Sequence, residues 1–252
     1  PSPTPTPSPS PTPEPSPEPS PEPTPEPSPE PTPTPPIPEY PAIPIRPDID
    51  PSRPMIALTF DDGPGVHTQR VLDTLERYSA VATFCQIGRQ IAGYAELDRA
   101  IVAQGSQIIS HTWDHWNLTK HTDDEIRWQL ETVNNALADI GVPTSRFFRP
   151  PYGSISADVQ RVAAELGLTA INWNVDPRDW DHKDAQQTYD RIMDKVKDGA
   201  IILCHDIYGE TADAMERVIP ELIARGYQLV TIAELLEYRG IEIVAGGVIY
   251  HG

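Results

Sequence analysis

The chain has 252 residues, of which 38% are hydrophobic, and a formal net charge of −18. This excess of acidic groups argues against nucleic acid and anionic membrane surfaces as partners. The sequence contains no apolar run long enough for a transmembrane span, and its two cysteines are too few to predict a disulfide framework.

Proline separates the chain into two parts. Of its 31 prolines, 23 fall in the first 50 residues, where they mostly alternate with Ser, Thr and Glu. Because proline fixes φ and lacks an N–H, we expect residues 1–50 to form an extended or disordered linker. We expect this linker to join an upstream anchor or module outside the cell or at its surface. Residues 51–252 are long enough for one domain with a full core.

Within residues 51–252, short apolar runs alternate with amphipathic stretches. The predicted elements, in chain order, are strand 55–60, helix 66–78, strand 81–88, helix 94–105, strand 106–111, helix 123–141, strand 146–153, helix 156–167, strand 169–176, helix 184–199, strand 200–206, helix 211–226 and strand 227–232. A left-handed C-cap is expected at the glycines that follow five of these helices, namely Gly105, Gly141, Gly167, Gly199 and Gly226.

The order of these elements predicts an α/β fold. Each strand after the first is reached across a helix, which implies parallel strands. Nearly all the strand runs are continuously apolar, so both faces of the sheet should be covered. An α/β barrel of seven or eight units fits this pattern best. The alternative is a doubly wound layer, but no G-x-G-x-x-G turn follows the first strand.

Polar residues cluster where the predicted strands end, and in parallel α/β folds chemistry occurs at the carboxyl ends. The first strand ends in Asp61 and Asp62. Neighbouring strand residues point to opposite faces, so both can reach one site only if the strand ends or bulges there, at Gly63 and Pro64. The other strand ends contribute His111, His115, Arg149, Tyr152, Asp176, Asp179, Trp180, Leu203, His205 and Asp206.

The stretch "SHTWDHW" holds two histidines, His111 and His115, four positions apart. They would share one face if the chain turns helically there, although this spacing fits a structural pair equally well. The metalloprotease pattern H-E-x-x-H is absent, because Thr112 stands where the glutamate would be. With Asp61 or Asp62 as the third ligand, the set would leave positions open for water and substrate, as in catalytic metal sites. We therefore predict a metal site.

Five motifs in order, "TFDDGP", "HTWDH", "RPPYG", "DPRDW" and "IILCHD", resemble those of the polysaccharide deacetylases of carbohydrate esterase family four, the nodulation-type deacetylase domain. The resemblance covers about residues 54–238. It implies a distorted (β/α) barrel with seven or eight parallel strands, and metal-dependent hydrolysis of acetyl groups by a catalytic domain at 51–252.

The resemblance also implies roles for individual residues. Asp62, His111 and His115 match the metal ligands, Asp61 the catalytic base, and His205 the general acid.

Five further positions match supporting roles in the same family. Arg149 resembles the residue that orients the base, and Tyr152 the donor of a backbone N–H to the oxyanion. Asp179 resembles the partner that tunes the catalytic histidine. Trp180 resembles a wall of the site, and Leu203 the floor of the acetyl pocket.

The resemblance implies an acetylated extracellular polysaccharide as substrate, with N-deacetylation of an N-acetylglucosamine glycan, of peptidoglycan or chitin type, placed first. O-deacetylation of acetyl xylan is the alternative. Zinc is the expected ion, with cobalt or another divalent ion as alternatives. Two rival classes are a catalytically inactive glycan-binding relative and a non-haem iron oxygenase, which also uses two histidines and one carboxylate.

Overall fold

The structure is a computed structural model that describes residues 39–42 and 44–252. Most of the predicted linker, residues 1–38 and 43, lies outside this description. The described strands are β1 (Met55–Gly63), β2 (Thr83–Gln86), β3 (Gln107–Ser110), β4 (Phe147–Phe148), β5 (Thr169–Ile171), β6 (Ile201–His205), β7 (Gln228–Leu229) and β8 (Val248–Ile249).

The helices lie mainly between these strands. The α-helices are α1 (Thr68–Arg77), α2 (Gly88–Ile91), α3 (Ala95–Ala103), α4 (Asp123–Asp139), α5 (Ala157–Glu165), α6 (Asp179–His182), α7 (Ala185–Lys195), α8 (Gly209–Ala224) and α9 (Ile232–Tyr238). Three short 3₁₀ turns are η1 (Ala92–Tyr94), η2 (Leu118–Lys120) and η3 (Pro151–Gly153). None of the helices among the described residues is long and apolar enough to cross a membrane.

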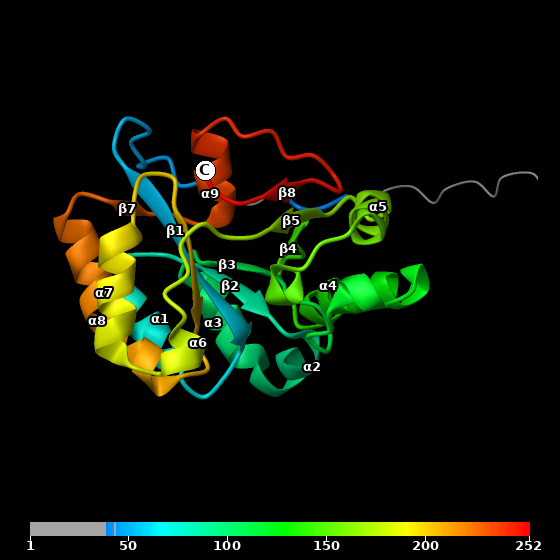
Figure 1. Ribbon diagram of the computed structural model, residues 1–252, viewed down its shortest axis with the longest axis horizontal. Coiled ribbons are helices and arrows are strands. Elements are labelled where there is room, and N and C mark those ends of the chain that lie inside the picture. Colours follow the sequence, from blue (N-terminus) through cyan, green and yellow to red (C-terminus); the bar gives the residue numbers. More distant parts are fainter. Residues whose placement is uncertain (1–38, 43) are drawn as a thin grey trace, which may run out of the picture. The chain divides into compact units, whose positions relative to one another are not determined.

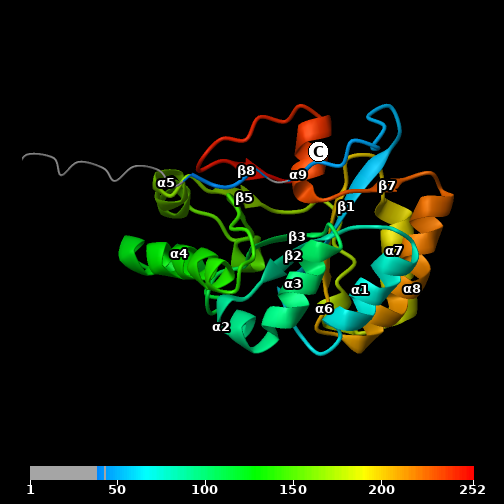
Figure 2. The ribbon, with the colours of Figure 1, turned by 180° about the vertical axis from the view of Figure 1, so that it is seen from behind.

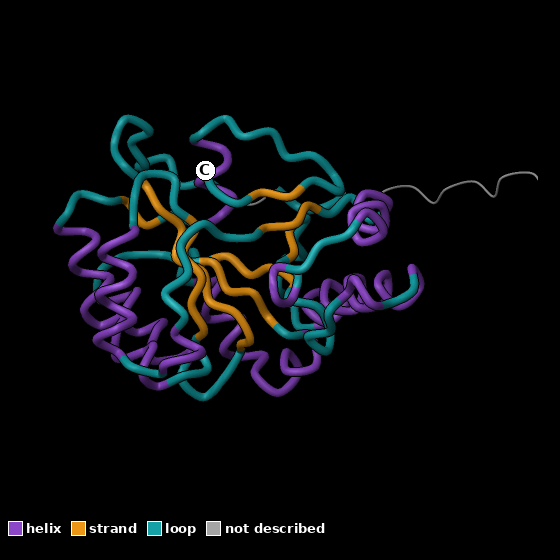
Figure 3. The backbone as a smooth tube through the Cα atoms, viewed as in Figure 1, coloured by secondary structure: helices purple, strands orange, loops and turns teal. Residues whose placement is uncertain are grey.

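The strands form a parallel, strongly curled sheet in the order β6-β1-β2-β3-β4-β5-β8, with β7 paired to the start of β1 (Figure 1, Figure 3). Beyond β5, Val175 forms an isolated parallel bridge with Ile202 of β6, which brings the two sides of the sheet together. The predicted distorted barrel with parallel strands is therefore confirmed. Its curl turns the carboxyl ends of β1, β3, β4 and β6 toward one another.

All seven predicted strands and all six predicted helices are present, most of them shorter than expected. The residue pattern did not predict β8, which has only two residues and follows a glycine pair, or the short helices α2, α6 and α9. Positive φ occurs at all five predicted C-cap glycines. Gly199 does not cap a helix, because α7 already ends at Lys195. Gly199 lies instead in the turn before β6.

Alternation along the strands determines which side chains reach the inside of the barrel. In β1, Met55 and Ala57 pack in one core cluster with residues of β3, β4, β5 and α9. Ile56, Leu58 and Phe60 pack in another cluster with helices α1 and α8. In the views of Figures 1 and 2, α1, α7 and α8 lie together beside the sheet. The period of two continues to the strand ends, so Asp61 shares the inner side with Met55.

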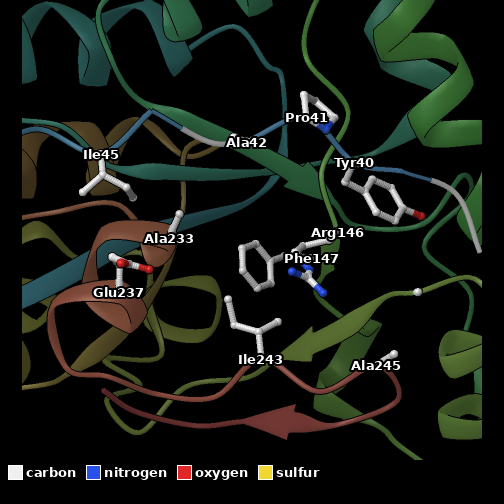
Figure 4. Close-up of a pocket in the computed structure, with 11 residues that line it drawn as sticks. Tyr40, Pro41, Ala42, Ile45, Arg146, Phe147, Ala233, Glu237, Ile243 and Ala245 are labelled. Carbon is white, nitrogen blue, oxygen red and sulfur yellow. The ribbon is translucent and has the colours of Figure 1, made fainter.

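Two segments cover the amino ends of the strands. One precedes β1, and the other follows α9. Tyr40 donates a hydrogen bond from its hydroxyl to the carbonyl of Leu166. A cavity of about 540 Å³ lies at this end, and Figure 4 shows Phe147 and Ile243 beside it. It lies at the opposite ends of the strands from the polar residues singled out above. The boundary predicted at residue 50 stays a prediction.

One ion pair fastens the segment before β1 to α9. The Arg46 guanidinium donates to both carboxylate oxygens of Glu234, at 2.8 and 2.9 Å. Glu234 is 1% exposed and also accepts from the backbone N–H of Thr231, completing a capping box at the start of α9. This side chain therefore links the helix cap to the preceding segment.

We expect Glu234→Ala to lower the free energy of unfolding by about 2 kcal/mol, because it leaves the Arg46 charge and the Thr231 N–H without their partner. Urea unfolding monitored by circular dichroism measures this change. Glu76→Ala, an exposed substitution on α1, serves as the control and should change the value by less than about 0.5 kcal/mol. Equal effects of the two substitutions would contradict the assignment.

Candidate active site

The two adjacent aspartates reach one site because β1 is irregular at its end. The register of β1 against β2 shifts between Asp61 and Gly63, and Asp62 has a φ of 71°. A residue in this left-handed conformation reverses the regular alternation of side chains. The break expected from the sequence at this point is confirmed.

His111 and His115 come together through a loop rather than a helix. Strand β3 ends at Ser110, and no helix is assigned to residues 111–117. Thr112 and His115 have positive φ values of 66° and 60°, and the His115 N–H donates to Thr112 Oγ1. The helical turn considered from the sequence is therefore wrong. Two left-handed residues fold the loop so that the imidazole centroids lie 4.9 Å apart.

Asp62, His111 and His115 form a group whose possible ligand atoms all lie within 4.8 Å of one another. Asp62 Oδ1 is 3.4 Å from His111 Nε2 and 3.3 Å from His115 Nε2. These separations are long for hydrogen bonds. They match two ligands that each lie about 2.1 Å from one tetrahedral ion, which places the ligands about 3.4 Å apart. Asp62 Oδ1 is also buried without a hydrogen-bond partner. These residues fit a divalent cation.

The pKa shifts of Asp62 and His115 suit a cation, whereas Asp61 and Asp62 raise the pKa of His111 against the effect of its burial. Burial of Asp62 opposes its ionisation, but the close approach of His111 and the charges of the nearby imidazoles lower its pKa to about 2. Burial and the neighbouring His111 lower the pKa of His115. His111 Nδ1 lies 2.8 Å from the carbonyl oxygen of Arg149, to which it donates, so Nε2 is the nitrogen available for a metal.

Asp61 is held by a buried arginine. Arg149 is fully buried, and its Nη1 donates to Asp61 Oδ1 at 2.8 Å and to Thr59 Oγ1 at 2.5 Å. Its Nε and Nη2 donate to the carbonyl oxygens of Ile171 and Asn172. Burial opposes the charge of Arg149, but Asp61 outweighs it and raises the pKa of the guanidinium. Asp61 therefore has one oxygen fixed by Arg149, while Oδ2 lies 3.7 Å from His111 Nε2.

His205 is paired with a buried carboxylate. Asp179, 1% exposed, accepts from His205 Nδ1 at 2.8 Å and from the His205 backbone N–H at 2.7 Å. Thr211 Oγ1 also donates to Asp179, at 2.7 Å. Burial disfavours the imidazolium, but the hydrogen bond and charge of Asp179 raise the pKa of His205 to about 9. The pairing with Asp179 therefore favours the protonated form of His205.

A hollow of about 450 Å³ lies over these groups, which we call the active-site hollow. Tyr152 is 67% exposed at its rim, with a φ of 60°, and its backbone N–H makes no hydrogen bond to any described residue. The lining residues are Asp61, Asp62, His111, His115, Tyr152, Trp173, Asp176, Trp180, Leu203, His205 and Tyr208.

The structure brings nearly all the candidate residues to this hollow. Arg149 and Asp179 lie behind it, in contact with Asp61 and His205. Asp206, also at a strand end, belongs to the other side of the sheet, where it is fully buried and accepts from Thr68 Oγ1. The roles assigned to individual residues stay predictions.

Two contributors in the segment after β6 were not predicted from the sequence. Tyr208 lines the hollow, and Thr211 holds Asp179. Both follow His205 within six residues, so their position after a chemically active strand end could have indicated them. Neither residue type is distinctive enough to stand out alone.

The chain matches the family model described as polysaccharide deacetylase over residues 48–171. It is 34% identical to the peptidoglycan-N-acetylmuramic acid deacetylase PdaC of Bacillus subtilis, over 79% of this chain and 42% of that protein. It is 36% identical to a chitooligosaccharide deacetylase of Azorhizobium caulinodans, over 69% of this chain and 90% of that protein. The chain thus spans less than half the length of PdaC.

Solved structures show the same likeness. A family 4 acetyl xylan esterase from Clostridium thermocellum, in complex with a cobalt ion, is 32% identical, with a TM-score of 0.72 over 78% of this chain and 98% of that one. The chitooligosaccharide deacetylase of Azorhizobium caulinodans is matched over 90% of its length at 36% identity, which is sufficient to assign the family. The chain belongs to the polysaccharide deacetylase family of hydrolases.

Proposed function

We propose that the chain hydrolyses acetyl groups from an extracellular polysaccharide, with N-deacetylation of N-acetylglucosamine residues in peptidoglycan or chitin-type glycan as its reaction. The observation that carries this proposal is the grouping of Asp62, His111 and His115 within 4.8 Å, beside Asp61 and below an open hollow. A metal-ligand set, a second carboxylate and a protonated histidine are the groups that metal-dependent hydrolysis of an acyl group requires.

Asp62, His111 and His115 would hold a divalent ion, for which zinc is our first assignment because two imidazoles and one carboxylate suit it. Such an ion, when bound, polarises the acetyl carbonyl and lowers the pKa of water. Cobalt is the alternative, since the similar acetyl xylan esterase structure contains it.

Asp61 is the proposed general base. Its Oδ2 is the oxygen left free by the Arg149 pair, so it can accept the proton of a water that attacks the acetyl carbon. The guanidinium of Arg149 is rigid and is held by three other hydrogen bonds, to Thr59, Ile171 and Asn172, so it fixes the orientation of the Asp61 carboxylate. Arg149 is thus proposed as a positioning residue.

Attack on the carbonyl creates an oxyanion, and the unpaired backbone N–H of Tyr152 is the proposed donor to it. His205 would then protonate the leaving nitrogen of the sugar, which releases acetate and a free amine. A histidine with a pKa of about 9 carries the required proton at neutral pH. Leu203 and Trp180, which line the hollow, would enclose the acetyl methyl group and the sugar.

The choice of substrate rests on the relatives. The likeness to a peptidoglycan deacetylase and a chitooligosaccharide deacetylase supports an N-acetylated glycan outside the cell. The likeness to an acetyl xylan esterase favours O-deacetylation of xylan as the second candidate. The proline-rich segment is proposed as a linker to an anchor or module.

Acetate release from peptidoglycan, chitooligosaccharide and acetyl xylan tests the proposed function. We expect release from at least one of the N-acetylated glycans. We expect Asp61→Asn to lower kcat at least about 10³-fold, because it removes the base, while metal affinity measured by calorimetry stays within about threefold. His111→Ala, the matched control, should lower metal affinity by at least about tenfold. An inactive wild-type protein would favour the glycan-binding alternative, and near-normal activity of Asp61→Asn would remove the base assignment.

The pH profile should depend on Asp179. His205 acts as an acid only while protonated, so activity should persist below its raised pKa of about 9 and fall above it. We expect Asp179→Asn to move the alkaline limb of kcat/KM to lower pH by at least about one unit, because the hydrogen bond and charge that favour imidazolium are lost. An unshifted limb with reduced activity would show that His205 is not the group titrating there.

A further inference from the structure

A second group of buried polar side chains lies behind the catalytic strand ends. Gln86 ends β2, Asp98 belongs to α3, and Asp206 directly follows His205 at the end of β6. All three are 0% exposed, and the lining of the active-site hollow does not include them. Each has a side-chain oxygen without a hydrogen-bond partner among the residues that the structure describes, namely Gln86 Oε1, Asp98 Oδ2 and Asp206 Oδ1. We call these three residues the buried acid cluster.

The unpartnered oxygens of Gln86 and Asp206 point to the same place. A Cβ added to Gly63 would lie 2.7 Å from Gln86 Oε1 and 2.7 Å from Asp206 Oδ1, so both oxygens pack against the Cα of this glycine. On its other side, Gln86 donates from Nε2 to Asp98 Oδ1 at 2.9 Å. Thr68 Oγ1 donates to the second oxygen of Asp206, Oδ2, at 2.5 Å. The amide of Gln86 therefore lies between two carboxyl groups.

One amide cannot satisfy two ionised carboxylates on its two sides. An amide has an NH₂ group on one side and an acceptor oxygen on the other. Gln86 gives its N–H to Asp98 and turns its oxygen toward Asp206. The opposite orientation of the amide would satisfy Asp206 and place the oxygen against Asp98. In either orientation, a carboxylate oxygen meets an amide oxygen with no hydrogen between them, which is costly in a buried site unless one positive charge is added.

We propose that Asp98 and Asp206 share one buried proton through the amide of Gln86. The proton is taken up from solvent when the chain folds. One carboxyl group then donates to Gln86 Oε1, the amide donates to the other carboxylate, and the buried acid cluster keeps a single negative charge. A calcium ion is the alternative occupant, but calcium takes about six or more oxygen ligands. The buried acid cluster offers three unpartnered oxygens, which favours the proton.

The surroundings of both carboxyl groups favour the protonated form. Burial raises the pKa of Asp98 to about 7, and the charge of Asp206 adds to the shift. Burial raises the pKa of Asp206 to about 7 as well; of the neighbouring charged groups, His205 lowers this pKa and Asp62 raises it. Because both values lie above those of the unfolded chain, folding takes up protons. The stability that the shared proton provides is present at acid pH and is lost as the pH rises through about 7.

Thermal unfolding of the full chain, followed by circular dichroism, tests this proposal. Asp98→Asn supplies an amide N–H in place of the shared proton, so Gln86 can donate to an ionised Asp206. We expect the Tm of the wild-type protein to fall relative to that of Asp98→Asn by at least about 4 °C between about pH 5 and about pH 9. Asp139→Asn, at an exposed position at the end of α4, is the matched control, and its Tm should change in parallel with that of the wild-type protein.

Infrared spectroscopy gives a second readout that needs no variant. The wild-type protein should show the C=O stretch of a protonated carboxylic acid at about pH 6, where ordinary carboxyl groups are ionised, and should lose it by about pH 9. Absence of this band would overturn the proposal, as would a Tm difference between the wild-type protein and Asp98→Asn that does not change with pH. If calcium chloride raises the Tm of the wild-type protein and not that of Asp98→Asn, the occupant is a metal ion and the proposal is wrong. None of these measurements uses catalytic activity, so their outcome is independent of the proposed function.

Discussion

The candidate site depends on one buried carboxylate oxygen. Asp62 Oδ1 has no hydrogen-bond partner and lies 3.3 and 3.4 Å from two imidazole nitrogens. An ionised oxygen that is removed from water and left unpaired costs free energy, and a shared cation would offset that cost. The same cation would account for two histidines that approach one carboxylate without forming good hydrogen bonds to it.

The fold creates this arrangement through strand alternation and a single irregularity. Parallel strands present their carboxyl ends at one edge of the barrel, and the period of two sends Asp61, Arg149 and His205 to the inner side. Regular alternation would send Asp62 outward. The shift in register and the left-handed Asp62 turn it back, so that two neighbouring carboxylates face the same hollow with different partners. One faces a guanidinium and the other faces two imidazoles.

The residue pattern was sufficient to predict the sheet, the long helices and the polar residues at the carboxyl ends of the strands. Buried strands and amphipathic helices each have a periodicity of apolar residues that can be recognised in the sequence. The loop that carries His111 and His115 has no such periodicity. Its left-handed residues are Thr112 and His115, neither of which is a glycine, so a helical turn was the expected route to the same pairing. Short elements such as β8 and α9 are held by contacts distant in sequence, because β8 pairs with β5 and α9 packs against the inner side of the sheet. Those contacts exist only in the folded chain.

The second carboxylate separates this site from that of an iron oxygenase, which also uses two histidines and one acid. Asp61, fixed by Arg149 next to the ligand group, has a use in hydrolysis and none in oxygen activation. The most direct test of the account is a crystal structure of the protein grown with zinc or cobalt, with anomalous scattering used to locate the ion. The account predicts one strong peak about 2.1 Å from Asp62, His111 and His115. An ion bound elsewhere, or held by Asp61 in place of Asp62, would contradict it.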